Sequence, residues 1–379
     1  MIYLDNNATT RPTAGVVAAM LPYLTNCYFN ASASTAAFTG ADKPRFHAAA
    51  ALAKLLNAEE SNCFVFTSGA TESNNWVFAS FAKGRKTGRI LISAVEHASV
   101  AEPAAELARV GFEIVEIPVD VYGLVQLDFL RNALTEDTVL VSIMAANNET
   151  GVMEPIADIG QLIREFAPIS LFHTDATQVV GKVPVDLQGA WRDVDLLSFS
   201  AHKFHGPKGI GGLYIRPGFE VEPIILGGGQ ERGLRSGTTN TPALAGLAAA
   251  ATEAIDLDYQ KTRDLRDIFE YRLEQELPDT VIHSRGISRL PNTSLFSLPG
   301  MVGDEVADTL AAAGIIVGTG AACSSGAIRA SKTLRAMGVV HDLAVGALRV
   351  SLSKTSNLED ITSAIVALKV VKERQQQSM

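Results

Sequence analysis

Residues 196–209 read LLSFSAHKFHGPKG, and this stretch decides the fold. Its apolar first part, Leu196 to Phe199, predicts a buried strand, and its Gly/Pro-rich second part predicts a turn. On such a turn the amine of Lys203 can point into a cleft and form a Schiff base with an aldehyde cofactor once its pKa is lowered. Most lysines are exposed to solvent instead, so this interpretation depends on the rest of the chain.

Other apolar runs bounded by turn residues precede this stretch, and helical patterns separate them. The runs span residues 63–67, 90–93, 113–117, 139–144 and 170–173, and the helical patterns span residues 45–56, 99–110 and 156–166. Strands that alternate with helices indicate βαβ units and a mainly parallel sheet.

The last third of the chain has a different pattern. An alanine-rich segment from Thr241 toward Leu277 predicts one or two long helices, and a strand at 293–297, a helix after Gly303 and a strand at 347–352 follow it. We therefore expect an α/β fold with two domains. Residues 16–259 would form the large domain with the mainly parallel sheet, and residues 1–15 and 260–379 the small one.

The composition excludes several classes of protein. The chain has 379 residues, a formal net charge of −9 and no cluster of Lys and Arg, so neither nucleic acid nor an anionic membrane is an expected partner. The first residues lack the basic and apolar regions of a signal peptide, which favours a cytoplasmic protein. Cys27, Cys63 and Cys323 are too scattered for disulfides or a CxxC metal site.

Two further segments follow predicted strands. Residues 66–75, FTSGATESNN, open a helix whose free N–H groups and dipole can hold a phosphate. An ordinary cap by Ser68 or Thr71 explains the same pattern equally well. Asp175, at the end of the strand at 170–173, can pair with a protonated pyridine nitrogen, although a helix cap is again an alternative.

Taken together, the ordered motifs resemble the NifS/IscS-type cysteine desulfurases, which belong to the class V aminotransferase group of fold-type I pyridoxal phosphate (PLP) enzymes. The motifs are YLDNNATT at 3–10, SGATESNN at 68–75, Glu96-His97, NNETG at 147–151, the pair Asp175 and Gln178, SAHKFHGPKG at 200–209, RSGT at 235–238 and GAACSSG at 320–326.

The resemblance implies a role for each matching residue. Lys203 would bind PLP covalently, His97 would stack on the pyridine ring and act in catalysis, and Asp175 would meet the ring nitrogen. Asn148 and Gln178 would approach the phenolic oxygen, while Ala70, Thr71, Ser200 and His202 would bind the phosphate. Arg349, with Asn148, would bind the carboxylate of the substrate, because a guanidinium can hold a carboxylate at two points. Thr238 would reach the phosphate of a neighbouring subunit, which implies a homodimer.

The resemblance also implies a reaction. L-Cysteine would become L-alanine, and its sulfur would pass to Cys323 as a persulfide for an unidentified acceptor protein, for example in iron–sulfur cluster assembly. A free thiol is only ~3% thiolate at pH 7, so Cys323 needs help from PLP, substrate and His97.

Two alternatives remain open. The same PLP site could perform transamination or β-elimination, but neither reaction needs a cysteine at position 323. A sulfur-binding scaffold without catalysis is the second alternative, and the joint presence of Lys203, Asp175, His97 and Arg349 argues against it.

The chain also departs from the family pattern. Ala31 and Ala33 stand in a stretch where relatives have Asn-Pro-Ser-Ser, Arg329-Ala330 stands where Glu-Pro is usual, and Ser353 replaces a common glycine. These changes leave the PLP residues intact and affect substrate access and partner choice. The sequence ends soon after its last predicted helix, so we expect weak or no binding to an iron–sulfur scaffold.

Overall fold

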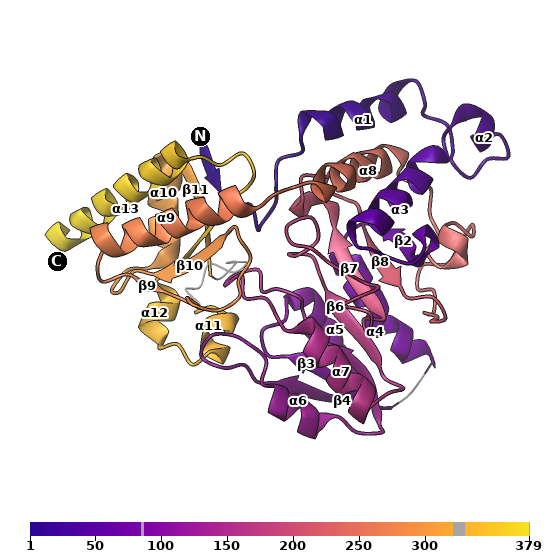
Figure 1. The fold of residues 1–379 in the computed structure, drawn as a ribbon, viewed down its shortest axis with the longest axis horizontal. Coiled ribbons are helices and arrows are strands. Elements are labelled where there is room, and N and C mark those ends of the chain that lie inside the picture. Colours follow the sequence, from indigo (N-terminus) through magenta and orange to yellow (C-terminus); the bar gives the residue numbers. More distant parts are fainter. Residues whose placement is uncertain (85–86, 321–329, 379) are drawn as a thin grey trace.

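The computed structural model describes residues 1–84, 87–320 and 330–378, and its two β-sheets form the centres of two lobes (Figure 1). The large lobe has a seven-stranded sheet in the order β2-β8-β7-β6-β5-β3-β4. Its strands are β2 (Phe64–Thr67), β3 (Arg89–Ser93), β4 (Glu113–Ile117), β5 (Thr138–Ser142), β6 (Leu171–Asp175), β7 (Leu196–Ser200) and β8 (Gly211–Ile215). Only β8 runs against the others, so the carboxyl ends of β2, β3, β5, β6 and β7 lie at one edge of the sheet.

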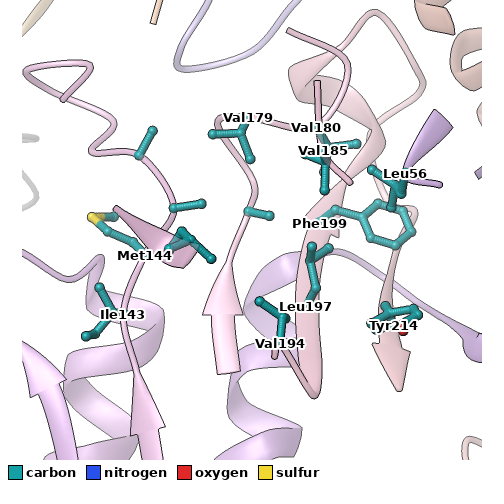
Figure 2. Packing of buried hydrophobic residues seen from close by; sticks show 14 of the residues in the cluster. Leu56, Ile143, Met144, Val179, Val180, Val185, Val194, Leu197, Phe199 and Tyr214 are labelled. Atoms are coloured by element: carbon teal, nitrogen blue, oxygen red, sulfur yellow. The ribbon is translucent and has the colours of Figure 1, made fainter. Parts of the chain in front are cut away.

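Helices cover both faces of this sheet because alternate side chains of each strand point to opposite faces. Leu197 and Phe199 belong to one buried cluster, with α3 (Lys43–Leu55), α6 (Leu127–Ala133), α7 (Ile156–Phe166) and α8 (Thr241–Ile255). Leu196 belongs to the other cluster, with α4 (Ala70–Gly84) and α5 (Ala98–Arg109). Figure 2 shows the first cluster. Leu56 and Tyr214 lie close to Phe199, while Val179 and Met144 continue the cluster across the sheet. Two N-terminal helices, α1 (Ala14–Thr25) and α2 (Ala36–Thr39), complete the lobe, and α1 packs on α8.

The small lobe has a five-stranded sheet in the order β1-β11-β12-β10-β9. Its strands are β1 (Ile2–Leu4), β9 (Val281–Ile282), β10 (Thr293–Ser297), β11 (Ile315–Thr319) and β12 (Ala347–Ser351). The helices of this lobe are α9 (Gln260–Glu276), α10 (Gly303–Ala312), α11 (Lys332–Ala336), α12 (His341–Val345) and α13 (Leu358–Ser378). Phe269 of α9 and Phe296 of β10 pack edge to face at 5.6 Å in its core.

The predicted α/β fold with a mainly parallel sheet is confirmed, and the expected strands lie within a few residues of their predicted positions. Several boundaries differ by one or two residues: for example, Cys63 belongs to a 3₁₀ turn (Ser61–Cys63), β5 ends at Ser142 and β6 extends to Asp175. The alanine-rich segment forms two helices, α8 and α9, which connect the lobes (Figure 1). The sequence did not predict β8, because it begins with two glycines, which are rare in strands. A Cβ at Gly211 would lie 2.3 Å from the carbonyl oxygen of Phe199, so this close strand packing requires glycine.

The N-terminus joins the two lobes. β1 pairs with β11 in the small lobe, and residues 5–10, which we call the N-terminal strap, then cross to the large lobe. Asn6 Nδ2 donates to the carbonyl of Ser351 at 2.8 Å, and Thr10 N donates to the carbonyl of His202 at 2.8 Å. The strap therefore holds β12 against the end of β7. Across the described ranges, no helix is both long enough and apolar enough to cross a membrane.

Candidate active site

A cavity of about 320 Å³ lies where the strap and the small lobe meet the carboxyl ends of the large-lobe strands. Most of the predicted site residues line it: Ala70, Thr71, His97, Asn148, Asp175, Gln178, Ser200, His202, Lys203 and Arg349. Thr238 lines a different cavity, together with Thr67, Ser68 and Gly209. Cys323 lies outside the described residues. The structure thus brings together side chains that are spread over 280 positions of the sequence, from Ala70 to Arg349.

Lys203 lies in a 3₁₀ turn (Ala201–Lys203) directly after β7. Its Nζ donates to the carbonyl oxygens of Asn7 at 2.8 Å and Ala8 at 2.9 Å, both in the strap. Burial, helped by the positive charge of Arg349, lowers the pKa of Lys203 to about 8. The amine is therefore held in the cavity and gives up its proton more readily than an exposed lysine.

The predicted phosphate-binding residues meet where β2 turns into α4. The backbone N–H of Ala70 donates to Ser200 Oγ at 2.7 Å, which links the start of α4 to the end of β7. A Cβ at Gly69 would lie 3.3 Å from the same Oγ. Thr67, and not Ser68 or Thr71, accepts from the N–H of Gly69 and so caps the turn. The small residues leave an open cradle at a helix N-terminus, which is a site suited to an anion.

His202 closes this cradle from the other side. Its Nδ1 lies 3.1 Å from Thr9 Oγ1, and burial together with the charges of Lys203 and Lys208 lowers the pKa of His202 to about 4. The imidazole is therefore neutral near pH 7.

A chain of hydrogen bonds connects Asp175 to His97. Asp175 Oδ2 accepts from Asn74 Nδ2 at 2.7 Å, and Asn74 Nδ2 also donates to Ser99 Oγ at 2.8 Å. His97 Nδ1 accepts from the backbone N–H of Ser99 at 3.1 Å, so in the neutral ring the proton is on Nε2. Asp175 Oδ1 accepts from Thr177 N and closes a turn. The described chain forms no helix between β6 and β7, so the helix cap that was the alternative interpretation is not present.

Arg349, on β12, forms the small-lobe wall of the cavity. Its Nη2 donates to Asp5 Oδ1 at 2.5 Å and its Nη1 donates to the carbonyl of Asn148 at 2.9 Å. Its Nε is buried and has no hydrogen-bond partner among the described residues. A buried N–H without an acceptor is costly, so this guanidinium is suited to an anionic ligand.

Glu149, next to Asn148, binds the residues that follow positions 321–329. It accepts from Ser331 Oγ at 2.6 Å and from Thr333 Oγ1 at 2.8 Å. On the other side of the gap, a Cβ at Gly320 would lie 3.5 Å from Glu149 Oε2. Gly320 and Ser331, which flank positions 321–329, therefore both lie close to Glu149.

Several residues of this site were not predicted from the sequence. Asn7 and Ala8 contribute main-chain carbonyls, Asp5 pairs with Arg349, and Asn74 and Ser99 connect Asp175 to His97. The asparagines lie inside motifs that the sequence analysis did recognise, YLDNNATT and SGATESNN. Their roles depend on how the strap crosses the cavity, which no local pattern reveals.

Known proteins resemble this chain over nearly its whole length. The family model described as aminotransferase class-V matches residues 2–363. Cysteine desulfurase 2 of Trichormus variabilis is 41% identical over 377 residues, which are 99% of this chain and 94% of that protein. A solved NifS-like protein superimposes with a TM-score of 0.91 at 36% identity, covering 98% of this chain and 99% of that one. Another solved structure, SspA in complex with cysteine, gives a TM-score of 0.81 at 30% identity over 93% of this chain and 99% of that one.

Proposed function

The chain belongs to the aminotransferase class-V family, and on this basis we propose that it is a PLP-dependent cysteine desulfurase. It converts L-cysteine to L-alanine and passes the sulfur to Cys323 as a persulfide. The observation that carries the proposal is one cavity lined by Lys203, Asp175, His97 and Arg349, in a chain that matches a cysteine desulfurase from end to end.

The residues present fit the cofactor. Asp175 is a buried carboxylate whose donors, Asn74 and Thr177, are neutral, so it can pair with a protonated ring nitrogen. The cradle at Ala70, Thr71, Ser200 and His202 can take the phosphate, Gln178 and Asn148 the phenolic oxygen, and Lys203 the aldehyde. Bound PLP supplies an electron sink that stabilises negative charge at the α-carbon of the substrate.

The protein side chains bind the substrate and move its proton. Arg349, which lines the cavity, holds the substrate carboxylate, because a guanidinium can bind a carboxylate at two points. Lys203 removes the Cα proton, because with a pKa of about 8 a useful fraction of the amine is neutral near pH 7. His97, with its proton on Nε2, assists the sulfur transfer at the cavity entrance.

Sulfur transfer requires a nucleophile. The Cys323 thiolate attacks the substrate Sγ, an S–S bond forms, and the Cβ–Sγ bond breaks. The electron pair of the broken bond stays with the substrate, whose β-carbon takes up a proton and becomes the methyl group of alanine. The persulfide then delivers its sulfur to an acceptor protein.

The test is to mix the PLP-loaded enzyme with L-cysteine and measure alanine and an added mass of about 32 Da on Cys323. Cys323→Ser should keep PLP but lose alanine production at least ~100-fold, the low end of what loss of a nucleophile costs. Cys27→Ser and Cys63→Ser are matched controls and should retain activity. Wild-type alanine release by Cys323→Ser would refute the proposal, and pyruvate in place of alanine would identify β-elimination.

The proposal includes a homodimer in which Thr238 reaches the phosphate site of the second copy. Thr238 is exposed and lines a cavity separate from that of Lys203 in its own chain. Exposed apolar side chains lie on α1, α2 and α3, which are neighbours at the outer edge of the large lobe (Figure 1): Val17, Leu21, Leu24, Phe38 and Phe46. A surface of this kind is suited to a second copy of the chain.

Light scattering tests this part. Leu21→Lys with Leu24→Lys should yield monomers with weaker PLP binding, whereas Val121→Lys, at an exposed apolar residue elsewhere, should leave a dimer. Two further parts of the proposal rest on the sequence: residues 16–259 and residues 1–15 with 260–379 act as two domains, and this protein is cytoplasmic.

A further inference from the structure

A second buried lysine, Lys182, lies behind the cavity wall. It is 4% exposed and does not line the cavity that contains Lys203. Its Nζ donates to Gln178 Oε1 at 2.7 Å and to Asn7 Oδ1 at 3.2 Å. No carboxylate in the described part of the chain forms an ion pair with it. Since a buried charge needs an opposite charge nearby, this lysine requires an explanation.

The two acceptors fit a neutral amine. A neutral amine has two N–H groups, and the structure offers it two amide oxygens, whereas the third proton of an ammonium would have no acceptor there. Burial, and the positive charges of Lys203 and Arg349, lower the pKa of Lys182 well below its usual value. His202 and His205 are the other titratable groups whose charge interacts with it, and their own pKa values are lowered.

Lys182 contacts the amide oxygens of two side chains that line the cavity, Gln178 and Asn7. A glutamine amide can turn by half a rotation and exchange its oxygen and nitrogen at little cost unless its partners differ. Because Gln178 Oε1 accepts from Lys182, Gln178 Nε2 is directed away from it and donates to the carbonyl of Asn7 at 3.1 Å. That same carbonyl accepts from Lys203 Nζ.

The Asn7 side chain is fixed in the same way. Its Oδ1 accepts from Lys182 and, at 3.0 Å, from Asn292 Nδ2, while its Nδ2 donates to Thr293 Oγ1 at 2.9 Å. Lys182 thus supports two residues that line the cavity with Lys203: Gln178 from the large lobe and Asn7 from the strap.

We propose that Lys182 is a positioning residue for this reaction: it holds the amide oxygens of Gln178 and Asn7, so that Gln178 presents an N–H donor to the cavity and Asn7 presents its carbonyl to Lys203. The inference deepens the proposed function and depends on it. Lys182 acts only through Gln178 and Asn7, and does not touch the substrate or the cofactor.

The test compares Lys182→Met, which keeps the length of the side chain and removes both hydrogen bonds, with Val180→Ala. Val180 is buried on the same turn and has no bond to Gln178, so it is the matched control for loosened packing. Two quantities are measured besides turnover: the affinity of the apo protein for PLP, and the pH midpoint of the absorption change of bound PLP near about 400 nm.

For Lys182→Met we expect about fivefold weaker PLP binding, the effect of one lost hydrogen bond. The pH midpoint should rise by about half a unit, since a phenolic oxygen without its donor holds a proton more tightly. Val180→Ala should change neither quantity. No change in Lys182→Met, or equal changes in both variants, would overturn the proposal.

A double variant keeps the test decisive if Lys182→Met fails to fold. Gln178→Met with Lys182→Met removes both partners and should fold, because no buried group is left unsatisfied. The pH midpoint of its bound PLP should equal that of Gln178→Met alone, as expected when Lys182 affects the phenolic oxygen only through Gln178. A further shift of the midpoint in the double variant would contradict the inference. Failure of the wild-type chain to bind PLP would instead refute the proposed function.

Discussion

The two walls of the cavity are built differently. The large-lobe wall consists of residues at the ends of neighbouring strands of one sheet, tied by bonds such as Ala70 N to Ser200 Oγ. The small-lobe wall has Arg349 on β12, which forms an ion pair with Asp5 of the strap, 344 positions earlier in the sequence. One wall is complete when a single sheet has folded, whereas the other exists only when the two lobes and the strap have come together.

This difference separates the expected effects of substitutions. The large-lobe wall carries the residues assigned to the cofactor, and the small-lobe wall carries the residue assigned to the substrate carboxylate. Changes on the first wall should therefore alter PLP capture, and changes on the second should alter the KM for cysteine.

The largest effect is expected at Lys203, whose amine lies in the cavity and binds two carbonyls of the strap. Lys203→Ala should abolish turnover and remove the lysine adduct that borohydride reduction traps, because no other amine lines the described cavity. The exposed Lys208, five residues later, is the control, and Lys208→Ala should keep the adduct. The reverse result would mean that the wrong lysine was assigned.

Arg349→Lys should raise the KM for L-cysteine by about 10- to 100-fold, since a lysine cannot hold a carboxylate at two points. PLP affinity, measured by titration of the apo protein, should stay unchanged. Asp5→Asn keeps the shape of the partner of Arg349 and should raise the KM less. If Arg349→Lys weakened PLP binding as much as cysteine binding, the two walls would not have separate roles in binding cofactor and substrate.

His283 tests the stability of the small lobe. Burial lowers its pKa to about 4, and its Nε2 lies 2.7 Å from Ser297 Oγ. Below about pH 6.5 the unfolded chain binds a proton on this imidazole, whereas the folded chain does not. The contribution of His283 to the free energy of unfolding is therefore complete above that pH and decreases on acidification. Acidification from pH 7 to pH 5 should lower the contribution of this residue to the free energy of unfolding by about 2 kcal/mol.

Denaturant unfolding of the wild type and His283→Gln at both pH values measures this contribution. The variant should lose about 2 kcal/mol less than the wild type on acidification. An equal loss in both proteins would contradict the assignment. A shift confined to one of two transitions would show that the lobes unfold separately.

The smallest effect is expected for Ser200→Ala. It removes the acceptor of the Ala70 N–H and should weaken PLP binding about fivefold while leaving the KM for cysteine unchanged. Ser198→Ala, two residues earlier on β7 and bonded to His173 instead, is the matched control and should bind PLP like the wild type. Equal losses in both variants would point to a general weakening of β7.

The sequence predicted the large-lobe wall better than the small-lobe wall. Lys203, Asp175 and Ala70 follow apolar runs whose period identifies strands, and the ends of parallel strands meet at one edge. Asn7 and Ala8 act through main-chain carbonyls. Every residue type has such a carbonyl, so the sequence gives no sign of this role. The strands β1 and β9 have only three and two residues, too few for a recognisable pattern. The roles assigned to all the site residues, including Thr238 and Cys323, stay predictions.

The N-terminal strap also sets the order in which the protein can be assembled during translation. Residues 5–10 leave the ribosome long before Ser351, but Asn6 binds the carbonyl of Ser351, 345 positions later, and β1 pairs with β11. The strands of the large sheet can pair while β1 is still without its partner, since domains fold as the chain emerges. Contacts between such distant residues are also the slowest to form. A nascent chain that has not yet reached β12 therefore possesses Lys203, but the two carbonyls that orient its amine are not yet anchored.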